Sequence, residues 1–361
     1  MALDIYTPFD LYAVMYDERQ TVSTAHWLEM FYPNSYVSTQ EEIAFDKIGA
    51  SRKIAPFMLP NEQGKPIYRR EGERISSFKP AYTKPKDAVR PTEMLQMQPG
   101  ELTRRLQLQS PEARYNAEVI RITQFHRNAI TRLWDYMGAR AVLDGFLRVN
   151  YVRDAGLPAQ SVLVDFGRDA AHTVTKASGS RWGESGVNIM SDIQGWIDLV
   201  AMAEFGGSVQ DIVLGAQAAV PFMDYFTNGA GKGLLDTTFR GSEDVSFNRG
   251  IVRTDPMRPF TQLGTLGSGT RVWRYTGSFQ NDNGSTTPIM DPRDVFLAAP
   301  GVDGVKAFGA ILDQGAQLRA QDIFTKMWDE NDPPARFIMS QSAPLMIPVN
   351  PNCTLKARVV A

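Results

Sequence analysis

The feature that most constrains the fold is a long stretch, residues 110–144, that predicts one uninterrupted helix. Ser110 is a favourable N-cap, and Pro111 suits the first helical position, where no amide donor is lost. Apolar side chains then recur at three- and four-residue spacing from Tyr115 to Met137, and no proline interrupts them. Gly145 is the natural end of this helix.

The length of this helix bears on the shape of the whole molecule. About 33 residues at a rise of 1.5 Å each give roughly 50 Å. A compact globule of 361 residues has a radius of gyration of only about 21 Å. Because the helix is about as long as such a globule is wide, we expect an elongated or flattened subunit with this helix as its spine.

Polar residues on the same helix form a second pattern. Arg114, Arg121 and Arg132 fall on nearly one line, away from the apolar stripe. Such a line is either a solvated face or a face turned toward phosphate or an acidic partner. His126 lies on the apolar stripe instead, where a hydrogen-bonded structural role is the expectation.

The segment before the helix is strongly basic. Between Lys47 and Arg90 there are eleven basic and four acidic residues, a net charge of +7 in a chain of −2, so the remainder carries −9. Six prolines from Pro56 to Pro91 exclude a long helix and favour extended chain or turns. We expect a long basic hairpin or arm outside the core. It is either a solvated loop or an arm that contacts an acidic neighbour, and the second explains its length and charge together.

Composition excludes several classes of protein. Hydrophobic residues make up 43% and charged residues 22%, which excludes intrinsic disorder of the whole chain. The net charge near zero argues against a dedicated nucleic-acid binder. The single cysteine, Cys353, excludes an intramolecular disulfide framework and a Cys-rich zinc site, and favours a reducing compartment. We expect neither a secretory signal in residues 1–16 nor a membrane span of ~18 apolar residues.

Short elements of both kinds follow the helix. We expect strands at residues 161–166, 212–214, 271–276, 294–298 and 305–311, and helices at 191–205 and 218–226. Ser191 and Gln194 form the expected capping box of the first of these helices. The alternation predicts a mixed domain between about 186 and 325. The tail predicts two strands, 336–347 and 354–360, joined by a turn at 348–352.

No arrangement of residues indicates catalysis. The three histidines are scattered, and none forms a nucleophile pair with Cys353. The glycine-rich run 229–233 lacks the first glycine and the Ser or Thr of a phosphate loop. Asp165 and Asp169 lack a third metal ligand. We therefore expect no catalytic residue, cofactor or metal, which suits a protein whose work is contact with copies of itself.

Three segments carry a resemblance to a known family. Residues 334–346 (PARFIMSQSAPLM) resemble the ending of the lambda-like capsid protein E family of tailed bacteriophages, and QSAPL is the most specific part. Residues 78–86 (FKPAYTKPK) resemble its arm motif. Residues 164–168 (VDFGR), followed by 178–182 (SGSRW), resemble a third block in the same order. The resemblance spans about residues 54–361.

The resemblance implies an α+β chain with the Hong Kong 97-type capsid fold. It implies an N-terminal arm over residues 1–50 and an extended β-hairpin loop over 51–95. A peripheral domain over 96–185 would contain the spine helix at about 110–144. Residues 186–329 would form an axial domain, and residues 330–361 would return to the peripheral domain.

The same resemblance implies a function. The chain would be a major capsid protein, not an enzyme, that forms pentamers and hexamers of an icosahedral shell around double-stranded DNA. The implied partners are copies of itself, a portal protein, a decoration protein and non-specifically bound DNA, without a membrane. A separate scaffolding protein is expected because no long charged coiled-coil segment precedes the arm. The chain would be assembled in the cytoplasm of a bacterial host and reside in the virion.

Two groups of residues are the expected contact sites. Inter-subunit contact is expected from the basic loop, through Arg69, Arg70, Arg74, Lys79, Tyr82, Lys84 and Lys86. Contact with DNA is expected from Arg114, Arg121 and Arg132. No Lys–Asn isopeptide bond is expected, because the lambda-like pattern implies none.

Two alternative functions stay open at this stage. An encapsulin-like cellular nanocompartment protein would share the fold, and its genomic neighbours would include an enzyme cargo. A soluble oligomeric enzyme of unknown type would elute as a small oligomer in size-exclusion chromatography. Negative-stain microscopy is the most direct test of a shell.

Overall fold

The computed structural model describes residues 7–15, 25–40, 42–47, 74–90, 111–151, 160–236, 238–240, 246–248, 259–267, 269–280, 284–316, 321–332 and 334–361.

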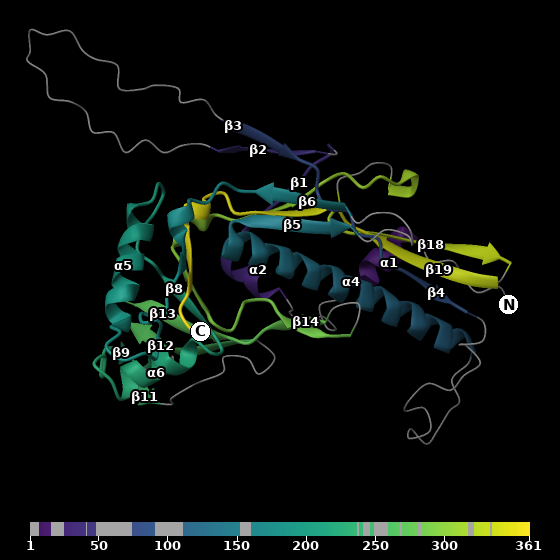
Figure 1. Ribbon diagram of the computed structural model, residues 1–361. Coiled ribbons are helices and arrows are strands. Elements are labelled where there is room, and N and C mark those ends of the chain that lie inside the picture. Colours follow the sequence, from purple (N-terminus) through teal and green to yellow (C-terminus); the bar gives the residue numbers. More distant parts are fainter. Residues whose placement is uncertain are drawn as a thin grey trace, which may run out of the picture.

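Helix α4 (Pro111–Asp144) runs along the long axis of the molecule, and its 34 residues confirm the predicted spine (Figure 1). It ends where Gly145 takes φ +75°, a left-handed conformation that favours glycine. A Cβ at this position would lie 2.7 Å from the Cβ of Arg168, so there is also no space for a side chain. Ser110, the expected N-cap, lies outside the described residues.

A seven-stranded mixed sheet occupies one end of the long axis, in the order β7-β21-β16-β8-β13-β12-β9 (Figure 1). Strands β8 and β16 at its centre are buried along their whole length, as strands covered on both faces are. Two helices, α5 (Ile189–Met202) and α6 (Ala219–Thr227), lie at the same end. The strands are β7 (Thr173–Thr175), β8 (Asp211–Gly215), β9 (Leu235–Asp236), β12 (Phe260–Leu266), β13 (Thr270–Tyr275), β16 (Asp294–Ala298) and β21 (Thr354–Arg358).

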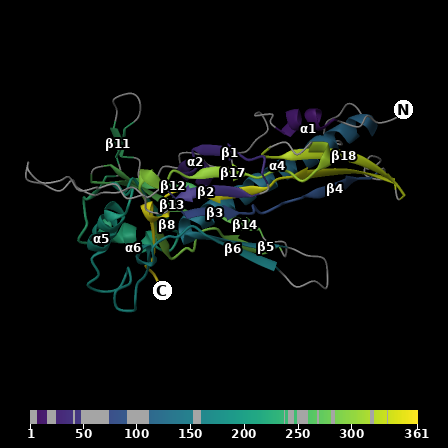
Figure 2. The same cartoon turned by 90° about the horizontal axis from the view of Figure 1, so that it is seen from above.

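A three-stranded antiparallel sheet, β18-β19-β4, occupies the opposite end (Figure 2). Its strands are β18 (Phe324–Asn331), β19 (Pro334–Gln341) and β4 (Lys86–Val89). Helix α1 (Pro8–Met15) and the first turns of α4 pack against it around a small separate core: Leu11, Val89, Tyr115, Val119, Ile122 and Ile338. The spine thus links two separate hydrophobic cores.

Shorter strand pairings complete the described part of the chain. Strand β1 (Asn34–Val37) runs parallel to β17 (Val305–Phe308), which pairs with β20 (Pro344–Ile347). Four two-stranded antiparallel pairs are also described, namely β2 (Ile43–Lys47) with β3 (Arg74–Phe78), β5 (Phe146–Tyr151) with β6 (Gln160–Asp165), β10 (Thr238–Arg240) with β11 (Ser246–Asn248), and β14 (Ser278–Gln280) with β15 (Thr286–Pro288).

Part of the segment expected as the N-terminal arm, residues 1–50, lies against the body of the molecule. Helix α2 (His26–Phe31) packs against α4, and Trp27 and Tyr32 are fully buried in the main core. Trp27 lies among the rings of Phe31, Phe260 and Phe296, at centroid distances of 5.5–5.8 Å. This segment is therefore part of the central body, because its aromatic side chains fill the space beside the spine.

Several strands pair with partners from other expected segments. Strand β4 lies within the expected loop 51–95, yet it is an edge strand of the β18-β19-β4 sheet. Strand β17 lies within the expected axial segment 186–329 but pairs with β1 and β20. Strand β21 was expected in the returning segment 330–361, yet it lies inside the seven-stranded sheet between β7 and β16. Strands that are close in the sequence belong to different sheets here, because each strand pairs with a partner distant in sequence.

Two local expectations about elements also need correction. The helix α5 begins after Asn188, whose side-chain oxygen accepts a hydrogen bond from the Ser191 amide, so the expected capping box at Ser191 and Gln194 is wrong. The expected tail strand 336–347 is divided into β19 and β20, which belong to different sheets. The expected strands at 161–166, 212–214, 271–276 and 294–298 and the helix at 218–226 are confirmed within a residue or two.

Candidate assembly surfaces and a charged cavity

The basic arm begins from an antiparallel strand pair. Ile43 pairs with Phe78 and Lys47 pairs with Arg74, on the side of the sheets away from α4 (Figure 1). Arg69 and Arg70 lie outside the described residues, and Arg74 is placed by its backbone in β3. The pairing of β2 with β3 therefore places Lys47 and Arg74 side by side, and the residues between them lie outside the described residues.

The chain after β3 is held against the QSAPL segment. The Thr83 amide donates to the Ser342 carbonyl at 2.9 Å, and the Ser342 amide donates back to Thr83 at 3.1 Å. Tyr82 donates its hydroxyl hydrogen to Gln341 Oε1 at 2.7 Å and accepts from the Leu312 amide at 3.2 Å. Burial raises the pKa of Tyr82 above its ordinary value. Two of the segments that carry the resemblance therefore contact each other within one chain.

The two lysines that follow are exposed but positioned. Lys84 Nζ lies 4.8 Å from the centroid of the Tyr82 ring. Lys86 Nζ lies 3.9 Å from the centroid of Phe337 and 5.2 Å from that of Trp328. Aromatic faces attract cations in this way. Both ammonium groups thus have a defined place on the surface. Lys79, which follows β3 directly, is also exposed.

The three arginines predicted to share one line on α4 differ in their exposure to solvent. Arg121 is 76% exposed and forms an ion pair with Glu118 at 2.5 Å. Arg132 is also exposed. Arg114 is buried, at 9% exposure, in the turns of α4 that α1 and the β18-β19-β4 sheet cover. A partner that approaches this face of α4 therefore meets Arg121 and Arg132.

His126 is a structural residue, as expected. It is fully buried, and its Nε2 lies 2.9 Å from Asp87 Oδ2 on β4. Its Nδ1 lies 3.1 Å from Ser340 Oγ on β19, and that hydroxyl lies 2.9 Å from Thr325 Oγ1 on β18. One imidazole thus joins the spine to β4 and β19 directly, and to β18 through the Ser340 hydroxyl.

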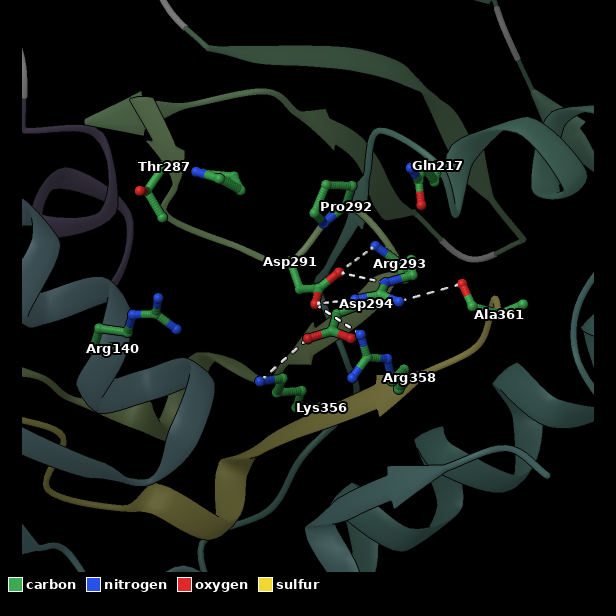
Figure 3. Close-up of a pocket in the computed structure, with 11 residues that line it drawn as sticks. Arg140, Gln217, Thr287, Asp291, Pro292, Arg293, Asp294, Lys356, Arg358 and Ala361 are labelled. Carbon is green, nitrogen blue, oxygen red and sulfur yellow. Dashed lines mark hydrogen bonds and ion pairs between the residues drawn. The ribbon is translucent and has the colours of Figure 1, made fainter. Parts of the chain in front are cut away.

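A cavity of about 610 Å³ lies where the C-terminal part of α4 meets the edge of the seven-stranded sheet (Figure 3). Charged side chains dominate its wall. It is lined by Arg140 from α4, Gln217, Thr287 and Pro288, residues 291–294, Lys356 and Arg358 from β21, and Ala361. Sequence reasoning missed this cluster, although basic residues at positions 356 and 358 lie on one face of a strand by simple alternation.

Each carboxylate in the cavity wall has a cation from the same chain. Asp291 accepts from Arg293 Nε at 3.1 Å and from Arg358 Nη2 at 2.9 Å. Lys356 Nζ lies 2.9 Å from Asp144 and 3.2 Å from Asp294. Burial raises the pKa of Asp294, and the nearby Lys356 only partly offsets this effect. Burial also acts to raise the pKa of Asp291, but the hydrogen bonds and charges of Arg293 and Arg358 prevail and lower it.

The side chains considered as metal ligands or as a nucleophile make structural contacts. Asp165 Oδ1 accepts from the Gly167 amide at 2.8 Å, and Asp169 Oδ1 accepts from the Ala171 amide at 3.0 Å. Cys353 is buried and its thiol lies 3.3 Å from the Phe205 carbonyl. In the part of the chain that the structure describes, no group of three His, Cys, Asp or Glu side chains could hold a metal ion. Among the same residues, no helix is long and apolar enough to cross a membrane.

Comparison with known proteins identifies the class first. A solved structure of a prophage capsid protein from Escherichia coli CFT073 superposes with a TM-score of 0.70 at 19% identity, covering 99% of this chain and 100% of that one. The fold is therefore that of Hong Kong 97-type phage capsid proteins, as expected.

The family follows from the sequence match. The family described as phage major capsid protein E matches residues 26–359. The major capsid protein of Escherichia phage lambda is 26% identical over 355 residues, which cover 97% of this chain and 98% of that protein. The major capsid protein of Enterobacteria phage P21 is 25% identical over 348 residues, which cover 93% and 94%. The chain belongs to the phage major capsid protein E family, whose members are structural proteins of the virion.

Proposed function

We propose that this chain is the repeating subunit of the icosahedral shell of a tailed phage, arranged in pentamers and hexamers around the double-stranded DNA genome. The observation that carries this proposal is the family match over residues 26–359. An elongated subunit with separate cores at its two ends suits the contacts that such rings require. Negative-stain micrographs of the purified protein should show closed shells; a small, defined oligomer would contradict the proposal.

The basic arm is our candidate for the contact between subunits. Its +7 charge faces a remainder of −9, so one copy's arm is attracted to another copy's surface. Single surface ion pairs give only about 0–1 kcal/mol, but the contact repeats around the shell. We expect Arg69, Arg70, Arg74, Lys79, Lys84 and Lys86 to make it, with Tyr82 as the intrachain anchor of the segment.

Charge reversal tests this contact. Glutamate at Arg69, Arg70 and Arg74 should abolish closed particles in micrographs. Lysine at the same three positions retains the charge and is the matched control, which should still assemble. Normal shells from the glutamate variant would refute the proposal.

The spine arginines are our candidate for contact with packaged DNA. Arg121 and Arg132 are exposed and can reach phosphates, and such contact would be independent of sequence and weakened by salt. Glutamine at both positions should lower genome retention and leave empty-shell assembly intact. Arg114→Gln is a separate variant, because its buried side chain predicts an effect on stability instead. Unchanged retention in the double variant would contradict this role.

The remaining partners are proposed from the family alone. They are a separately encoded scaffolding protein, a portal protein and a decoration protein on the outer surface, with assembly in the host cytoplasm. A pull-down from purified virions should find a second abundant shell protein if a decoration protein is present. Its absence would remove that partner from the proposal.

A further inference from the structure

We propose that the charged cavity between α4 and β21 is a binding site for a phosphate group. Figure 3 shows its polar side chains converging from several elements. Arg140 comes from the spine, Arg358 and Lys356 from β21, and Gln217 from the turn between β8 and α6. The volume of about 610 Å³ lies in the range of small-ligand sites, and the charged wall favours a charged ligand.

The carboxylates in the wall do not exclude an anion, because cations of the same chain pair with all of them, Lys356 with two. Asp291 is bound by Arg293 and Arg358, and Lys356 bridges Asp144 and Asp294. Arg293 is further occupied by the Ala361 oxygen at 3.5 Å. Its Nε and Nη2 both bind Asp291, so Arg293 has little left to offer a ligand.

The guanidinium groups of Arg140 and Arg358 have N–H donors left for a ligand. A guanidinium carries five N–H donors in a fixed plane. Among the described residues, Arg358 donates from Nη2 alone, to Asp291. Arg140 donates from Nη1 alone, to Asp144, in a long contact of 3.4 Å. The other donors of both side chains meet no hydrogen-bond acceptor in the described part of the chain, and both side chains line the cavity.

Phosphate is the anion that this arrangement fits best. The planar fork of arginine matches phosphate oxygens in pairs, and such charge-assisted hydrogen bonds are short and strong. The volume exceeds that of one small anion, so it accommodates a phosphate that is part of a larger group. A ligand held by Arg140 and Arg358 together would join the spine helix to the seven-stranded sheet and should stabilise the fold.

The phosphate could come from a free anion such as pyrophosphate or from a DNA phosphodiester. The site itself needs no shell, so it can be tested on the purified full-length chain whatever its state of assembly. Thermal unfolding is measured while pyrophosphate is added at ionic strength held constant with sodium chloride. The variants are Arg140→Gln and Arg358→Gln. The matched control is Arg271→Gln, which removes an arginine paired with Asp211 on the same sheet but outside the cavity.

We expect a saturable rise of the melting temperature for the unchanged protein and for Arg271→Gln. Each cavity variant should require at least tenfold more pyrophosphate for the same rise. Arg140→Gln loses one long hydrogen bond to Asp144 and a contact with the Tyr136 ring at 5.5 Å. Both are weak, so its melting temperature without ligand should stay close to that of the unchanged protein. The proposal would be overturned if the unchanged protein showed no saturable rise, or if the cavity variants responded to pyrophosphate as the unchanged protein does.

A competition arm identifies the source. If a short DNA duplex displaces pyrophosphate and loses this effect in Arg140→Gln, the site takes phosphodiesters. If the duplex does not compete, the site takes free phosphate anions. Either result supports the site, provided that the arginine dependence holds.

Discussion

Replacing Asp135 by Asn should change how stability depends on pH. Asp135 lies on the buried side of α4 and is 3% exposed. Its Oδ1 accepts from the amides of Trp27 at 2.7 Å and Leu28 at 3.1 Å, which begin helix α2. Burial raises the pKa of Asp135 to about 7, although these two hydrogen bonds act in the opposite direction.

The direction of the change in stability with pH follows from proton binding to Asp135. Between pH ~4 and the raised pKa of about 7, the folded chain holds a proton on Asp135 that the unfolded chain has released. Stability from this group is therefore complete at low pH and is lost as the pH rises through that window. A raise of about three pKa units corresponds to about 4 kcal/mol in all, of which about 2–3 kcal/mol falls between pH 5 and 8.

Asparagine keeps the carbonyl oxygen that accepts both amide hydrogen bonds but does not titrate. The assay is urea unfolding of the unchanged protein and Asp135→Asn at pH 5, 6, 7 and 8. The free energy of unfolding of the variant, relative to the unchanged protein, should rise by about 2–3 kcal/mol across this range. Asp165→Asn, which changes an exposed aspartate, controls for the loss of one charge.

A second variant separates the charge from the hydrogen bonds. Asp135→Ala leaves the amides of Trp27 and Leu28 buried without this acceptor, which should cost about 1–3 kcal/mol even at pH 5. A difference between Asp135→Asn and the unchanged protein that stays constant from pH 5 to 8 would refute the reasoning. So would a difference that falls as the pH rises.

Three further predictions concern single substitutions, each read from thermal or urea unfolding. Trp27→Ala removes a fully buried ring from the aromatic cluster and should destabilise the chain by about 3–5 kcal/mol; a loss below 1 kcal/mol would show that α2 is not part of the core. Gly145→Ala should lower stability by at least about 1 kcal/mol, because φ is +75° and the new Cβ would meet Arg168; an unchanged melting temperature would contradict this. His126→Leu should cost about 1–3 kcal/mol by ending the hydrogen bonds to Asp87 and Ser340, and a stabilised variant would show that these bonds are unimportant.

The spine was predictable because its signal is local. The cap, the stripe and the glycine that define α4 all lie within about 36 residues, and helical periodicity needs nothing further. Helix α2 and strand β1 were not predictable in the same way, since they have only six and four residues. Trp27 depends on Asp135, 108 positions away, and β1 depends on β17. A short element fixed by distant contacts leaves no periodic pattern.

In the candidate sites, too, local features were predictable from the sequence and contacts between distant residues were not. The basic character of residues 47–90 is visible in the composition. The sequence does not show that the Tyr82 hydroxyl forms a hydrogen bond with Gln341 of its own chain. The cavity of Figure 3 brings Arg140 to Arg358, which are separated by most of the chain. The basic residues at positions 356 and 358 share one strand face by alternation, yet nothing local in the sequence indicates that the spine lies opposite them.

The position of the QSAPL segment explains why it carries the resemblance so clearly. Gln341, Ser342 and Leu345 are buried, and they hold the residues that follow β3. Because this segment is buried within its own chain, it stabilises the fold and is not available for contact with a neighbouring subunit. The exposed lysines at positions 84 and 86 lie at the end of the segment that it holds, supported by aromatic rings. The contact between the QSAPL segment and the residues after β3 therefore fixes the positions of these two lysines. Substitution of the lysines should alter assembly without altering the fold. Substitution of Gln341 or Ser342 should alter both.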